Sequence, residues 1–282
     1  MAFFVRKILE KTVKLLSAVF VLCVLAIAVA CGGGSKSSAT SGAISGNWEI
    51  TMVRHNLATP FIYSGFLLQS GSTITGSVIL NGGNGCSGVG PVSGTIDSQN
   101  LQLDINESGQ EVSLTGALSQ TGGAPSIAGQ FSSVAGGCED FTSTGTWTAV
   151  QIPPLTGTFH GSFSTTGNSA TTIDVSGTLT QGPNIGASNA ALSGTMTATS
   201  STAFCAYLTT ASVTGLISGT SVTLNLFGPD GSQIGQVPAP ASPPATIAPD
   251  ASSLTGSFTL APISNSCGQL SGAAGALTLT FP

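Results

Sequence analysis

Residues 100–118 read NLQLDINESGQEVSLTGAL, and this stretch decides the fold class. Apolar and polar residues alternate over 100–105 and again over 111–118, with the turn-forming residues 106–109 between them. Because successive side chains of a β-strand point to opposite faces, this period of two predicts strands with one buried face. Two such runs separated by a short turn predict an antiparallel hairpin.

The same alternation recurs along the chain, and turn residues interrupt it about every 8–12 positions. No sustained helical stripe follows residue 45. The pattern predicts an all-β fold, an antiparallel meander whose first half has strands over 46–53, 61–69, 72–80, 90–97, 100–106, 110–119, 125–133 and 141–150. About eight strands close a small barrel, and a two-sheet sandwich is the alternative.

An internal repeat organises the body. The segment GNW at 46–48 matches GTF at 157–159, and SIAGQF at 126–131 matches SLTGSF at 253–258. Matching features in register over more than a hundred residues indicate duplication. The repeat predicts two tandem β domains, residues 45–150 and 155–282, joined by the linker 151–154.

The second copy is longer than the first because of the segment 232–251, which is rich in proline. Proline cannot donate to a strand ladder, so it is excluded from central strands. We therefore expect 232–251 to form a surface loop between two strands.

The N-terminus has the features of a signal peptide. Residues 1–14 carry four basic residues, Arg6, Lys7, Lys11 and Lys14, and the following run 15–30 is uncharged and mostly apolar. That run is shorter than the roughly 20 residues that span a bilayer, and small residues close it. Residues 1–30 are therefore predicted to be a helical signal peptide that is cleaved.

Residues 25–31, LAIAVAC, resemble the lipobox of bacterial lipoproteins. The resemblance implies that Cys31 becomes the lipidated N-terminus, which holds the protein to a membrane, and Gly32 at the next position implies the outer membrane. Residues 31–44, rich in Gly and Ser, predict a flexible tether. The expected location is the cell envelope, with the body facing the periplasm or the cell surface. An ordinary signal peptide with an unmodified Cys31 is the alternative.

Charge excludes some partners. After residue 30 the chain has two basic residues, Lys36 and Arg54, against ten acidic ones, a formal balance of −8. Binding to nucleic acid requires basic side chains that neutralise phosphate. Nucleic acid is therefore not an expected partner.

Four cysteines follow Cys31, and they fall two per repeat at equivalent places: Cys86, Cys138, Cys205 and Cys267. An exported protein meets an oxidising environment, in which paired cysteines form disulfides. Of the three connectivities, the repeat favours Cys86–Cys138 and Cys205–Cys267. No Cys-x-x-Cys pair is present, so a cysteine metal site is disfavoured.

One cluster of polar side chains is a candidate site. In an up-and-down barrel alternate loops share one end, and three such loops carry Arg54, His55, Glu107, Glu139 and Asp140. Carboxylate oxygens gathered there could hold Ca²⁺ or orient the polar group of a bound ligand. The alternative is that these residues are solvated loop charges.

Catalysis is not expected, because the chain has two histidines and no Gly-x-Ser-x-Gly nucleophile elbow, and no cofactor is predicted. The segment Gly46-x-Trp48 resembles the opening of lipocalin-type and avidin-type barrels, which implies binding of a small molecule. The main hypothesis is a non-catalytic binding module for a small apolar molecule or a glycan, with a cavity lined by Trp48, Phe66, Phe131 and Trp147. The alternative is a structural or adhesive surface lipoprotein, whose barrels would be filled.

Overall fold

The structure is a computed structural model. It describes residues 44–55, 57, 59–80, 88–107, 109–120, 124–134, 142–166, 172–184, 188–198, 210–260 and 272–282. All of these residues belong to the compact unit Ser41–Pro282. The signal peptide 1–30 and Cys31 lie outside the described residues. Within those residues no helix is long and apolar enough to cross a membrane.

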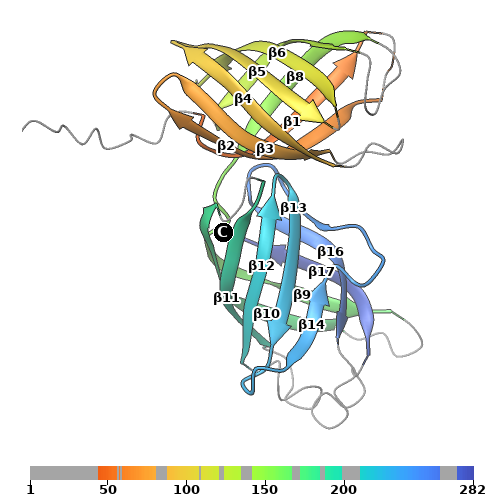
Figure 1. Cartoon of the computed structure of the whole chain (residues 1–282). Coiled ribbons are helices and arrows are strands. Elements are labelled where there is room, and N and C mark those ends of the chain that lie inside the picture. Colours follow the sequence, from red (N-terminus) through yellow and green to blue (C-terminus); the bar gives the residue numbers. More distant parts are fainter. Residues whose placement is uncertain are drawn as a thin grey trace, which may run out of the picture. The chain divides into compact units, whose positions relative to one another are not determined.

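The first domain is a closed antiparallel barrel of eight strands (Figure 1). Its strands are β1 (Gly46–Arg54), β2 (Phe61–Ser70), β3 (Thr73–Leu80), β4 (Val89–Asp97), β5 (Asn100–Glu107), β6 (Gln110–Ser119), β7 (Ser126–Ser133) and β8 (Ser143–Ile152). Each strand pairs with the next, and the hairpin that opened the sequence argument is β5 and β6, in which Leu103 lies opposite Leu114.

Closure excludes the sandwich alternative. Strand β1 pairs with β8 from Asn47 opposite Ile152 to Arg54 opposite Gly145, which leaves neither strand with a free edge. Alternating burial along the strands follows from the period of two: in β4, Val92 and Ile96 are buried whereas Ser93 and Thr95 are exposed. The predicted all-β barrel is confirmed, and β8 extends two residues into the segment predicted as linker.

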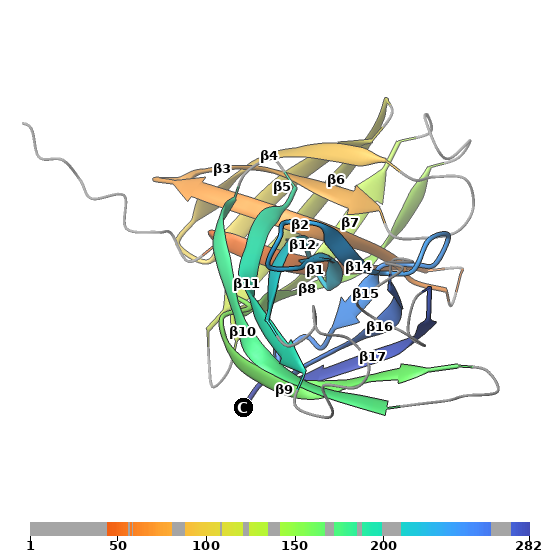
Figure 2. The same cartoon turned by 90° about the horizontal axis from the view of Figure 1, so that it is seen from below.

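The second domain repeats this ring (Figure 2). Its strands are β9 (Gly157–Thr165), β10 (Thr172–Asn184), β11 (Ala190–Ala198), β12 (Ala211–Ser218), β13 (Ser221–Phe227), β14 (Gln233–Val237), β15 (Ala245–Ile247), β16 (Ser253–Leu260) and β17 (Ala274–Thr280). Pairing of β12 with β13 and of β17 with β9 closes the ring.

Two short strands share the sixth position of the second barrel. Strand β14 pairs with the C-terminal half of β13, and β15 pairs with the first residues of β13. Both also pair with β16. The expectation of a loop throughout 232–251 is corrected: 233–237 and 245–247 contain no proline and can donate to a ladder, and the prolines at 238, 240, 243 and 244 lie between these strands.

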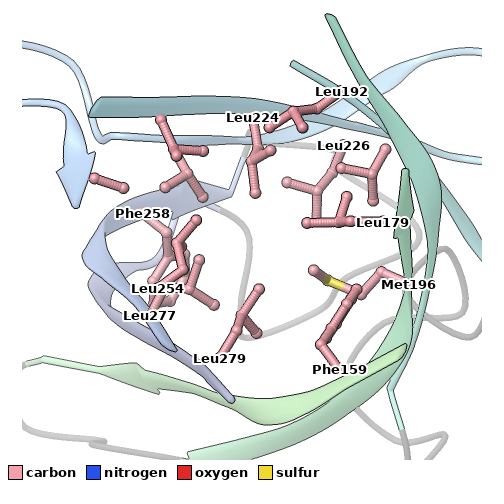
Figure 3. Close-up of a cluster of buried hydrophobic side chains, with 14 of the residues drawn as sticks. Phe159, Leu179, Leu192, Met196, Leu224, Leu226, Leu254, Phe258, Leu277 and Leu279 are labelled. Carbon is pink, nitrogen blue, oxygen red and sulfur yellow. The ribbon is translucent and has the colours of Figure 1, made fainter. Parts of the chain in front are cut away.

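Buried aliphatic and aromatic side chains form one hydrophobic cluster in the described part of the second barrel. In Figure 3, side chains from strands all around the ring point toward one another. Phe163 and Phe258 make the closest ring contact of this core, with centroids 4.6 Å apart. The labelled members are Phe159, Leu179, Leu192, Met196, Leu224, Leu226, Leu254, Phe258, Leu277 and Leu279.

Candidate functional site

The interior of the first barrel is the first place to look for a ligand site, and two tryptophans occupy it. Trp48 and Trp147 are 0% and 1% exposed. The Trp48 indole N–H donates to the carbonyl of Ile44 at 2.8 Å, and the Trp147 indole N–H donates to the carbonyl of Thr115 at 2.9 Å. Both indole donors are therefore satisfied by backbone, and neither is available to a ligand.

Glycines on neighbouring strands make room for Trp147. Gly129 lies directly opposite Trp147 in the β7–β8 register. A Cβ placed on Gly116 of β6 would lie 2.8 Å from Cζ2 of Trp147, which is closer than two carbons approach each other. The indole therefore covers two adjacent strands, and packing accounts for glycine at these inward-facing positions.

Of the four side chains predicted to line a cavity, Trp48, Trp147 and Phe131 belong to the first core and Phe66 does not. Phe66 packs in the same cluster as Ile152 and Leu155. The period of two explains this correction: Tyr63 and Leu67 are the buried β2 side chains of the first core, so Phe66 must point to the outer face.

The base of the first barrel carries a latch that sequence reasoning missed. Ile44, which was assigned to the tether, is 0% exposed. Its backbone N–H donates to Oε1 of Gln69 at 3.2 Å, and the backbone N–H of Gln69 donates to Oγ of Ser45 at 2.9 Å. Gln151 adds a bond from Nε2 to the carbonyl of Ser45 at 2.8 Å. Ile44 therefore belongs to the folded body and not to the predicted tether.

The second barrel repeats this latch. The N–H of Leu155 donates to Oε1 of Gln181 at 2.9 Å, and the N–H of Gln181 donates to Oγ1 of Thr156 at 3.1 Å. Leu155 is 1% exposed. The signal was present in the repeat, because extending the match of Gly46 with Gly157 by two residues aligns Ile44 with Leu155.

The predicted ligand or cation site lies at the opposite end of the first barrel. Arg54 ends β1 and its guanidinium lies 4.1 Å from the centre of the Phe61 ring, a cation–π contact. The backbone N–H of His55, an exposed residue, donates to the carbonyl of Thr144 at 3.1 Å. Glu107 is the last residue of β5, and the topology brings these chain segments to one end.

Glu139 and Asp140 of the predicted site lie outside the described residues. Among the residues that the structure does describe, no group of three or more His, Cys, Asp or Glu side chains could hold a metal ion. The proposed Ca²⁺ site stays a prediction.

Cys86, Cys138, Cys205 and Cys267 also lie outside the described residues. Their flanking strands are β3 and β4, β7 and β8, β11 and β12, and β16 and β17 respectively. In each barrel the topology directs both cysteine-bearing connections to one end of the ring. The two disulfides stay predictions with which this topology is compatible.

Comparison of the chain with protein-family models, with curated proteins and with solved structures finds no match.

Proposed function

We propose that the protein is a non-catalytic, lipid-anchored component of a bacterial cell envelope that acts through the outer surface of its two barrels, in a structural or adhesive role. The anchor follows from the lipobox resemblance at Cys31. The structural or adhesive role is inferred from the buried core and the outer surface of the barrels.

The packed interior is the observation that carries this proposal. A barrel that carries a small molecule needs internal space and a few polar groups directed into it. In the first barrel, Trp48 and Trp147 occupy the interior with their N–H groups already bonded to backbone carbonyls. A ligand entering the described part of this core would have to displace an indole that is fully buried.

The outer surface offers hydroxyl groups and little charge. Outward positions of β8 carry Thr144, Thr146 and Thr148, all exposed. In the second barrel, the hydroxyls of Thr178 and Thr195 are 3.2 Å apart across neighbouring strands. A surface of this kind can hydrogen-bond to another hydrated surface without charge repulsion, which supports a structural or adhesive role.

Binding inside the barrel is tested by tryptophan fluorescence of the full mature chain during titration with a nitroxide-labelled fatty acid. We expect no saturable quenching of the buried indoles. Leu114→Ala titrated with xenon, a heavy-atom quencher of indoles, is the positive control, because it removes a side chain that is 1% exposed in the same interior and opens a cavity large enough for such a small probe. Saturable quenching of the unmodified protein would instead support the carrier function.

The anchor is tested separately. Cys31→Ser in the full precursor should abolish incorporation of labelled palmitate and release the protein from the membrane fraction. Cys23→Ser is the matched control and should leave both unchanged. Labelling of the Cys31→Ser protein would contradict the assignment of the lipidated residue.

A further inference from the structure

The turn between β12 and β13 is bonded to the outer face of β1. The Asn47 side chain, 2% exposed, donates from Nδ2 to the carbonyl of Gly219 at 2.8 Å. The backbone N–H of Gly219 donates back to Oδ1 of Asn47 at 2.6 Å. The side-chain N–H and the side-chain oxygen of Asn47 are thus both hydrogen-bonded to the backbone of Gly219.

Bonds on either side of this pair extend the joint. The hydroxyl of Ser64 in β2 donates to the carbonyl of Ser218 at 3.2 Å, and the hydroxyl of Ser218 donates to the carbonyl of Ser64 at 3.4 Å. Thr220 donates from Oγ1 to Oε2 of Glu49 at 2.7 Å. Ser64 is 0% exposed although it lies on the outer face of its barrel.

An apolar contact adjoins these polar bonds. Phe66 follows Ser64 on the outer face of β2, and it is 5% exposed. It belongs to the cluster that contains Leu155 and the core of the second barrel. The joint therefore combines buried hydrogen bonds with buried apolar surface, as stable interfaces do.

The repeat shows that the joint depends on glycine. The equivalent turn of the first barrel places Ser98 at φ 58°, almost the same as φ 55° at Gly219. Ser98 is exposed, whereas a Cβ added to Gly219 would overlap the Ser64 side chain. The two turns share a backbone conformation, and only the one with glycine can approach β2 this closely.

We infer that the Asn47–Gly219 joint makes the two barrels a single cooperative body, so that neither unfolds independently of the other. These hydrogen bonds and the buried contact of Phe66 are lost when either barrel unfolds, so unfolding of one barrel removes stabilising interactions from the other. The linker 153–154 then connects two domains that are already fixed by direct contact.

Differential scanning calorimetry of the full mature chain tests this inference. The unmodified protein should unfold in one transition whose calorimetric and van't Hoff enthalpies agree. Gly219→Ala should divide this transition into two. Gly71→Ala is the matched control, because Gly71 has φ 62° in a hairpin turn and nothing within 4 Å of an added Cβ, so it bears the same backbone strain without touching the joint.

A second variant separates loss of the joint from misfolding. Asn47→Leu keeps the branching and the number of side-chain heavy atoms and removes both amide bonds, and it should also produce two transitions, each close in temperature to those of Gly219→Ala. Two transitions in the unmodified protein, or one transition in both Asn47→Leu and Gly219→Ala, would overturn the inference.

Discussion

The sixth position of each barrel is filled in a different way. In the first barrel one continuous strand, β6, spans the full height of the wall. In the second barrel β14 and β15 divide that position, and the proline-rich connection 238–244 joins them. The difference teaches that a barrel wall can be interrupted if each half keeps its own ladder partners and the residues that cannot donate lie in the gap.

The interiors differ at the same place. Trp147 of the first barrel lies opposite Gly129, and Leu277 of the second lies opposite Gly256 in the equivalent register. Beside Gly256 the space is taken by Ala245 and Val237, the residues on either side of the proline-rich connection. The smaller Leu277 and the interrupted wall therefore belong together, as do Trp147 and the continuous β6.

Removing the indole of Trp147 should give the largest change in the free energy of unfolding. We expect Trp147→Ala to lower the free energy of unfolding by about 4 kcal/mol, because a fully buried aromatic side chain leaves a large cavity. Urea denaturation of the mature chain measures it. Thr148→Ala, on the exposed face of the same strand, should stay within about 0.5 kcal/mol. An equally small effect of Trp147→Ala would show that the indole does not support the barrel.

Overfilling the same interior should cost less. Gly116→Ala places a methyl group against Trp147 and should destabilise by about 1–3 kcal/mol. Repeating the substitution in a Trp147→Leu background should reduce this penalty, which a double-mutant cycle measures. Gly182→Ala is the control, because its added Cβ meets no atom closer than 3.7 Å. Equal penalties in both backgrounds would contradict the contact.

The hydroxyl of Ser257 should stabilise the proline-rich connection, with a smaller effect on the free energy of unfolding than the two substitutions above. The N–H of Ala239 donates to Oγ of Ser257 in β16 at 3.1 Å. Ser257→Ala should lower stability by about 1 kcal/mol through loss of that bond. Ser193→Ala removes an exposed strand hydroxyl and serves as the reference in the same urea titration. If the two variants are indistinguishable, the connection is not held at this point.

Substitution in the turn after β15 should have the smallest effect on stability, and its signature is the pH dependence of Tm. The Ser252 hydroxyl and backbone N–H both donate to Oδ1 of Asp250, at 2.6 and 3.0 Å, and they lower the pKa of this carboxyl from its ordinary 3.8. A lowered folded-state pKa contributes stability above the unfolded pKa that is lost as pH falls through the folded value. The Tm difference between the unmodified protein and Asp250→Asn should be positive at pH 7 and vanish in strong acid.

Ser252→Ala provides the check on that pH dependence. It removes the hydroxyl bond that contributes most to the lowered pKa of Asp250. Its Tm difference from the unmodified protein should decline over the same acidic range. A difference that is constant with pH would assign the effect to the turn backbone and not to the carboxylate.

The period of two was sufficient to predict the strands of the first barrel, since one slipped residue would move every apolar side chain out of the core. This period was applied incorrectly to Phe66, which lies on the outer face of β2 and is apolar because it packs in the cluster of Ile152 and Leu155. Composition also misled at 232–251, where average proline content concealed two strands free of proline. Bonds between distant segments, such as Gln69 with Ile44, have no local pattern that reveals them.

The predicted site was only partly accessible to the same reasoning. Loop order in a meander correctly gathers Arg54, His55 and the end of β5 at one end of the ring. The cation–π contact of Arg54 with Phe61 was not predicted, because it depends on side-chain rotamers across a loop. The sequence could therefore predict which end of the barrel these residues occupy, but not the contacts that their side chains make.

The latch at Ile44 has a mechanical consequence. A force applied along β1 from its N-terminal end meets a strand that is bonded on both sides, to β2 and to β8. Both ladders would be loaded in shear, so their hydrogen bonds share the load and do not open one after another from a free edge. Because the ring is closed, β1 has no free edge from which it could be peeled away.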